Sequence, residues 1–186
     1  MAEDIAEGQQ VPAGFDPRLL GKAQSDADEQ EVQRGKLVQY VSFKVDDSEY
    51  GIDIMAVREI QGWVNVTTLP NTPEYVRGVL NLRGTIVPIF DLRCRFGNGL
   101  TDATPLHVVI IVAVGERIMG LLVDAVSDIL TIGSEEILPV PEIEARAEQR
   151  FLNGLITVQE RMVALLQIEK LFDIEELVAR VGAAAE

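Results

Sequence analysis

The stretch from residue 77 to residue 91, Arg-Gly-Val-Leu-Asn-Leu-Arg-Gly-Thr-Ile-Val-Pro-Ile-Phe-Asp, decides the fold class of this chain. Two runs rich in branched aliphatic residues, 76–82 and 85–90, lie on either side of the pair Arg83-Gly84. Apolar runs of this kind joined by a two-residue turn that contains glycine are typical of a β-hairpin. The stretch therefore predicts two adjacent antiparallel strands.

Two residues inside these runs predict irregularities in the strands. Gly78 indicates a bulge or the close approach of another backbone segment, and Pro88 indicates an edge or bulged strand because proline has no amide hydrogen to donate. Asp91 then offers an N-cap for a short helical turn over 92–96, which ends at Gly97. The hairpin is thus expected to end in a capped turn.

Short strands of the same kind are also expected before and after this hairpin in the sequence. Apolar residues alternate with polar ones over 37–45, and Gly115-Glu116 is a two-residue turn between apolar runs. A spacing of three residues in Ile54, Val57 and Ile60 predicts a short helix. Further strands are expected at 37–45, 50–54, 64–69, 106–114, 117–123, 125–132, 151–157 and 162–168. Nine or ten short strands with little helix favour barrels or a sandwich over a parallel βαβ sheet.

The composition excludes several classes of protein. Thirty acidic and 16 basic residues give a formal charge of −14, which repels nucleic-acid phosphates and anionic lipid, so we expect no nucleic-acid binding. The longest uninterrupted apolar run, 108–114, is far shorter than the roughly 20 residues of a membrane-spanning helix, so we expect no membrane insertion. The start of the chain lacks the pattern of a signal peptide, and a single cysteine points to a reducing compartment. We therefore expect a cytoplasmic protein.

Residues suited to catalysis or metal binding are scarce. His107 is the only histidine and Cys94 the only cysteine, which leaves no metal site rich in either and no ordinary nucleophile–histidine pair unless His107 takes part. Because His107 stands in an apolar segment, we interpret it as structural. The neighbours Arg93 and Arg95 would lower the pKa of the Cys94 thiol, so a redox role is a minor hypothesis beside simple packing. No metal, cofactor or enzymatic activity is expected.

The two ends of the chain and one internal region differ from the rest. Residues 1–36 carry eight acidic and four basic side chains with few apolar ones, which predicts a disordered acidic tail ahead of a domain over 37–182. Asp173 and Glu176 form an Asp-x-x-Glu cap that predicts a C-terminal amphipathic helix. Within 58–95, arginines outnumber acids by five to three, and this basic-leaning region in an acidic chain suits a protein contact.

Several motifs, quoted in chain order, resemble the CheW family. They are Tyr50-Gly51-Ile52-Asp53-Ile54, Val57-Arg58-Glu59-Ile60, Leu69-Pro70-Asn71-Thr72-Pro73, the run from Arg77 to Gly84, Ile86-Val87-Pro88-Ile89-Phe90-Asp91-Leu92-Arg93, the run from Gly120 to Asp128, Gly154-Leu155-Ile156 and the run from Leu165 to Leu171. The resemblance covers about residues 37–172 without large gaps. Gln167 departs from the pattern, because many members of the family carry an acidic residue at that place.

The resemblance implies a mostly β fold, namely two intertwined small β-barrels with a few short helices and a C-terminal helix. It also implies a non-enzymatic chemotaxis adaptor that couples methyl-accepting chemoreceptors to the histidine kinase CheA, through the regulatory domain of that kinase. Such a protein would be cytoplasmic and recruited to membrane-associated receptor arrays. The positions that match the receptor contacts of the family are Val57, Glu59, Ile60, Gly78, Asn81, Arg83 and Gly84. The residues that would bind the kinase stay unknown.

Other interpretations remain open at the level of the sequence. A paralogue that serves a pilus or another chemosensory system would share all of these motifs. The CheW-like part of a CheV protein, or of the kinase itself, is disfavoured by the few residues on either side of the domain. A small barrel enzyme would need acidic residues with shifted pKa values, and the paired acids of this chain lie in turns or helix starts. A plain dimerising β-module would associate with itself through an exposed strand edge.

Overall fold

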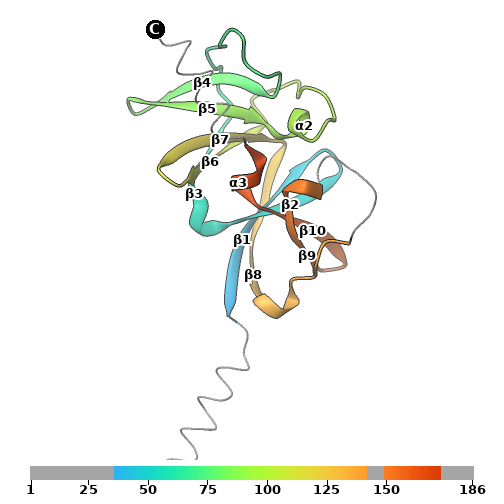
Figure 1. Ribbon diagram of the computed structural model, residues 1–186. Coiled ribbons are helices and arrows are strands. Elements are labelled where there is room, and N and C mark those ends of the chain that lie inside the picture. Colours follow the sequence, from blue (N-terminus) through green and yellow to red (C-terminus); the bar gives the residue numbers. More distant parts are fainter. Residues whose placement is uncertain (1–35, 142–148, 173–186) are drawn as a thin grey trace, which may run out of the picture. The chain divides into compact units, whose positions relative to one another are not determined.

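The computed structural model describes residues 36–141 and 149–172 of the chain. It confirms the mostly β architecture, in which ten described strands are joined by short helical turns (Figure 1). The strands are β1 (Leu37–Val45), β2 (Ser48–Asp53), β3 (Val57–Gly62), β4 (Val76–Leu82), β5 (Thr85–Asp91), β6 (Val108–Val114), β7 (Arg117–Val123), β8 (Ala125–Gly133), β9 (Leu152–Val158) and β10 (Arg161–Leu166). The helical turns are η1 (Ile54–Ala56), α2 (Leu92–Arg95), η2 (Ser134–Glu136), η3 (Gln149–Phe151) and α3 (Ile168–Leu171). The predicted C-terminal helix and the predicted tail up to residue 35 lie outside the described residues.

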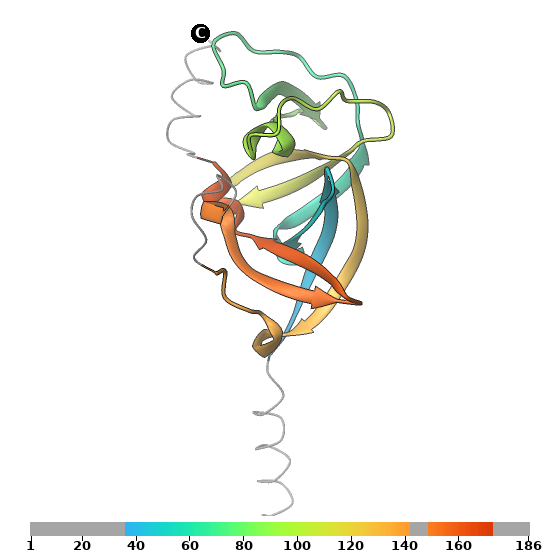
Figure 2. The ribbon, with the colours of Figure 1, turned by 90° about the vertical axis from the view of Figure 1, so that its right-hand side faces the viewer.

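The strands form two five-stranded sheets with matching topology. In the first, which we call barrel A, the order is β8-β1-β2-β10-β9, and in the second, barrel B, it is β3-β6-β7-β5-β4. Each contains a hairpin paired in parallel with the last strand of another hairpin, β2 with β10 and β7 with β5. Isolated bridges, Thr67 with Val79 and Leu138 with Leu155, extend the pairing at β4 and β9. Figure 2 shows the curl of barrel A from the side.

The chain passes from one barrel to the other twice. Strand β3 follows the β1–β2 hairpin of barrel A but pairs in barrel B, and β8 follows the β6–β7 hairpin of barrel B but pairs in barrel A. Strands β1 to β5 therefore correspond one by one to β6 to β10. The register supports this equivalence, since Gly51 faces Leu165 across the parallel pair in barrel A and Gly120 faces Ile89 in barrel B. The two barrels are therefore built from the same succession of strands.

Three apolar clusters hold the barrels together. The largest lies between the barrels and contains Phe43, Phe90 and Leu121. A smaller cluster around Leu165 fills barrel A, and another around Ile111 fills barrel B. On the paired strands β6 and β7, successive side chains point alternately into the shared core and into barrel B, which explains why these strands are apolar on both faces.

One predicted element was confirmed in part and another was wrong. A short helix does follow β2, as η1, but the spacing of three residues between Val57 and Ile60 comes from a β-bulge in β3. The register shift at Arg58 lets Val57 face Val112 and Ile60 face Ile110, both on the same side of the sheet. Residues 64–69 do not form a strand, because only Thr67 makes a bridge before Pro70 ends the segment.

The prediction that Pro88 marks an edge or a bulge was also wrong. Strand β5 lies between β4 and β7 in the sheet. Counting from the two-residue turn, Pro88 stands opposite Val79 at a position that exchanges no hydrogen bonds with β4. Pairing with β7 begins only at Ile89, so the missing amide hydrogen costs no hydrogen bond of the sheet. The bulge predicted at Gly78 is confirmed by the register shift between Val76 and Gly78.

Candidate functional site

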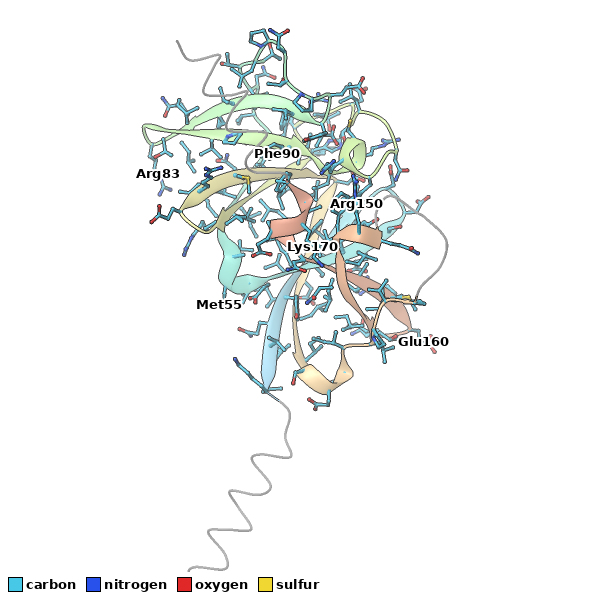
Figure 3. All side chains as sticks on the ribbon, in the orientation of Figure 1. Met55, Arg83, Phe90, Arg150, Glu160 and Lys170 are labelled. Carbon is cyan, nitrogen blue, oxygen red and sulfur yellow. The ribbon has the colours of Figure 1, made fainter. Side chains whose placement is uncertain are left out.

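Most of the site residues suggested by the sequence lie on β3 or at the tip of the β4–β5 hairpin, which an ion pair joins. The guanidinium Nη2 of Arg83 lies 3.2 Å from Oε2 of Glu59, and the two side chains are 81% and 32% exposed. Figure 3 shows Arg83 at the free tip of the hairpin. The ion pair therefore spans the gap between the first and the last strand of the sheet. An exposed pair of this kind stabilises a fold by about 0 to 1 kcal/mol.

Residues of the turn itself stabilise the backbone conformation around Arg83. Arg83 and Gly84 have φ angles of 53° and 90°, as the central residues of a type I′ turn require. The Oδ1 atom of Asn81 accepts a hydrogen bond of 2.8 Å from the amide of Gly84. Asn81 and Gly84 thus shape the turn, and Arg83 is the side chain that the turn presents.

Apolar side chains accompany the ion pair. Val57 is half-buried against the shared core, whereas Ile60 is 44% exposed on the same face of β3. Ile86, which stands opposite Asn81 across the hairpin, is 59% exposed. Ile86 was not among the predicted site residues, although counting outward from the Arg83–Gly84 turn places it on the face of Asn81. We call Val57, Glu59, Ile60, Asn81, Arg83 and Ile86 the barrel B surface.

Gly78 lies apart from this surface. It is buried, and its φ is 138°. A Cβ atom built there would lie 2.2 Å from the backbone oxygen of Thr67, which forms the bridge to Val79. The backbone that approaches Gly78 is therefore a neighbouring segment of the same chain, and this glycine serves the closure of barrel B.

The other arginines of the basic-leaning region do not gather on one face. Arg77 binds the buried Asp91, and Arg93 lies 3.1 Å from Asp46. The guanidinium of Arg95 stacks on the rings of Tyr75 and Phe151, 4.6 and 4.9 Å from their centroids. Arg77, Arg93 and Arg95 thus serve separate structural contacts, whereas Arg83 belongs to the barrel B surface. Arg58 is exposed on β3, between two residues of that surface.

Asp91 forms a buried polar node beside α2. Its carboxylate accepts hydrogen bonds from the amide of Cys94 and from the amide and hydroxyl of Thr101, and it lies 3.4 Å from the guanidinium of Arg77. This confirms Asp91 as the predicted N-cap. The node fixes α2, the segment leading to Thr101 and the bulged start of β4 together.

Cys94 and His107 occupy structural positions. Burial raises the pKa of the Cys94 thiol, and the nearby carboxylates of Asp91 and Glu74 raise it further against the lowering effect of Arg77. The expectation that Arg93 and Arg95 lower the pKa of this thiol was therefore wrong, because the pKa is raised and the cation that opposes the rise is Arg77. His107 Nδ1 accepts the amide hydrogen of Thr104, and its Nε2 lies 3.6 Å from Asp124 Oδ1, so the ring ties two segments together.

Among the described residues, no group of three or more His, Cys, Asp or Glu is placed to hold a metal ion. No helix in the described part of the chain is both long and apolar enough to cross a membrane. The barrel B surface instead combines exposed isoleucines with an ion pair at a hairpin tip. Such a combination suits contact with an apolar stripe on a partner protein.

The chain is similar to known chemotaxis proteins over most of its length. The family model for the CheW-like domain matches residues 39–176. A probable chemotaxis protein CheW of Rhizobium etli is 46% identical over 132 residues, which is 71% of this chain and 85% of that protein. The chemotaxis protein CheW of Klebsiella aerogenes is 43% identical over 139 residues, or 75% of this chain and 84% of that protein.

A solved structure supports the same relationship at the level of the fold. The crystal structure of the scaffolding protein TtCheW from Thermoanaerobacter tengcongensis matches with a TM-score of 0.68 and 33% identity. The match covers 74% of this chain and 89% of that one. The similarity therefore extends through both barrels.

Proposed function

The chain belongs to the family of CheW-like domains, and from this premise we propose that it is a non-enzymatic adaptor that couples methyl-accepting chemoreceptors to the histidine kinase CheA. In this role the protein is recruited from the cytoplasm to membrane-associated receptor arrays. The barrel B surface is the part that meets the receptor, and the regulatory domain of the kinase is the second partner.

One observation supports the proposed receptor contact. The barrel B surface combines exposed isoleucines with an exposed arginine at the tip of a turn. Ile60 and Ile86 offer apolar area to a helix, and Arg83 is 81% exposed although it touches Glu59. A helix with an apolar stripe can bury such side chains and place a carboxylate near the guanidinium.

Co-sedimentation tests this function directly. The full chain is mixed with membranes that contain a chemoreceptor, with and without the kinase, and autophosphorylation of the kinase is measured in the same samples. We expect the chain to sediment with the membranes, to bring the kinase with it and to raise kinase activity. Failure to bind either partner while the chain remains folded would contradict the proposal. It would favour a paralogue that serves another system, such as a pilus.

A further inference from the structure

A basic pocket lies beside the short helical turns η3 and α3. Its volume is about 370 Å³, and it is lined by Arg95, Arg150, Phe151, Glu169, Lys170 and Phe172. Figure 2 shows η3 and α3 on one side of the domain and the curved strand β8 on the other. Three cations and one carboxylate thus share one pocket in a chain whose formal charge is −14.

Packing holds two of these cations in place. The Phe151 ring is buried, and the guanidinium carbons of Arg95 and Arg150 lie 4.9 and 4.5 Å from its centroid. Arg95 Nε also donates a hydrogen bond of 2.7 Å to the carbonyl oxygen of Leu171. Because stacking and hydrogen bonding already restrict these side chains, an anion that binds here has little side-chain entropy to offset.

The charge of the pocket favours a carboxylate as its ligand. Neither Arg150 nor Lys170 forms an ion pair with another described residue. Figure 3 shows both side chains, one on η3 and the other on α3. Glu169 also lines the pocket but offsets only one of the three positive charges. A carboxylate can accept two hydrogen bonds from one guanidinium, which makes it a strong partner for such a site.

The chain itself supplies carboxylates next to the pocket. The described residues end at Phe172, which lines the pocket, and 14 residues follow it in the sequence. Asp173, Glu175 and Glu176 are among the first four of them, and Arg180 is the only basic one. Four extended residues span about 14 Å, so these carboxylates are within reach of the pocket. Attachment to the same chain also gives them a high effective concentration there.

We propose that this pocket binds the acidic start of the chain's own C-terminal segment, residues 173–186. The carboxylates of Glu175 and Glu176 then pair with the cations of η3 and α3. Because Arg95 belongs to α2, far earlier in the chain, the bound segment contacts both halves of the domain and stabilises their arrangement, by an amount that salt reduces. The inference does not rest on the function proposed above, since the barrel B surface lies on β3 and the β4–β5 hairpin.

Hydrogen exchange in the full chain tests this docking. Peptic peptides that cover residues 173–186 are followed by mass spectrometry. Arg150→Glu/Lys170→Glu reverses the charge of the pocket, and Glu175→Gln/Glu176→Gln removes the charge of the segment. The swapped variant combines Arg150→Glu/Lys170→Glu with Glu175→Lys/Glu176→Lys. The matched control, Glu135→Gln/Glu136→Gln, changes an exposed pair of glutamates on η2 in the same way.

We expect the amides of the segment to exchange more slowly in the unmodified chain than in an unstructured peptide of the same sequence. The pocket variant and the segment variant should each raise the exchange rate about threefold to tenfold, and high salt should do the same in the unmodified chain. The swapped variant should regain most of the protection, and the control should exchange as the unmodified chain does. Circular dichroism checks that every variant is folded.

Three outcomes would overturn the inference. If the segment of the unmodified chain exchanges as fast as the unstructured peptide, it does not dock. If its protection persists in both the pocket variant and the segment variant, apolar contacts and not charges hold the segment. An equal loss of protection in the η2 control would show that the effect reflects net charge alone.

Discussion

The first half of the domain, residues 37–96, and the second half, 108–172, share a topology but differ in several polar side chains. Both halves contain a hairpin, a crossover strand, a second hairpin and a short helix. Yet Asp91 caps α2 with its side chain, whereas Gln167 at the equivalent place before α3 makes no side-chain cap. Arg83 at one hairpin tip corresponds to Gln159 at the other. The arrangement of strands is therefore the same in the two halves, whereas several polar side chains differ. We expect the two halves to have distinct roles at these polar positions.

The largest difference is expected between Gly78 and its equivalent, Gly154. Gly78→Ala would strain a φ of 138° and press the new methyl group against the Thr67 backbone, so we expect a loss of roughly 3 kcal/mol or more of unfolding free energy. At Gly154 a Cβ atom would lie 2.5 Å from Cγ2 of Ile137 and 3.1 Å from the backbone oxygen of Leu138, but the φ angle is not positive. Gly154→Ala should therefore cost less, about 1 to 2 kcal/mol. Urea denaturation of both variants measures the difference. Equal losses would contradict the distinct role of Gly78 in closing barrel B.

The next difference concerns the helix caps. Asp91→Ala would remove the acceptor of the buried Thr101 amide and hydroxyl and the counter-ion of the partly buried Arg77, and we expect a loss of roughly 3 kcal/mol. Gln167→Ala removes no capping side-chain hydrogen bond and should cost less than about 1 kcal/mol. Thermal unfolding of the two variants gives the comparison. A small effect at Asp91 would show that the node is not a stabilising contact.

The halves also show which features were predictable from the sequence. The hairpins could be predicted because their pattern, apolar strands joined by a two-residue turn such as Arg83-Gly84, depends only on residues that are close in sequence. The bulge at Arg58 was read as helical spacing, since one extra residue in a strand imitates a helical period over a short window. The position of β5 inside a sheet could not be predicted, because it depends on pairing with β7 far along the chain.

The candidate site was predictable only in part. The motif match named Glu59 and Arg83, and the structure brings them to 3.2 Å. Gly78 belongs to the same motif but serves the closure of barrel B, a distinction that depends on the position of Thr67. Ile86 was missed because exposure is a property of the assembled barrels. The equivalence of β3 and β8 is also hidden, since their sequences share little beyond valine, an acidic residue and isoleucine.

A smaller effect is expected for the stability contributed by the Glu59–Arg83 pair. Because Arg83 is 81% exposed, Arg83→Gln should lower the unfolding free energy by less than about 1 kcal/mol. Gln159→Arg, at the equivalent tip of barrel A, should change it as little. Denaturation at low and high salt measures both variants. A loss of several kcal/mol in Arg83→Gln would assign the pair a structural role in place of a binding one.

The smallest expected effect concerns the reactivity of the Cys94 thiol. Because burial raises the pKa of Cys94, the thiolate fraction at pH 8 should be lower than in the unfolded chain, and alkylation by iodoacetamide should be slower. The rate should rise with pH through a midpoint above the ordinary thiol value of about 8.5. Mass spectrometry of native and urea-unfolded chain follows the reaction. Faster alkylation of the native chain would instead support a reactive thiol.

The most direct test of the account is receptor binding by Arg83→Glu and by the swapped pair Glu59→Arg/Arg83→Glu. The single variant loses the ion pair and the exposed cation, whereas the swapped variant restores an ion pair but moves the cation to β3. Arg150→Glu on η3 serves as the control for charge. We predict that both Arg83 variants bind the receptor fragment at least about tenfold more weakly while remaining folded, and that the control binds normally. Unchanged binding by folded Arg83→Glu would contradict the assignment of the barrel B surface to the receptor.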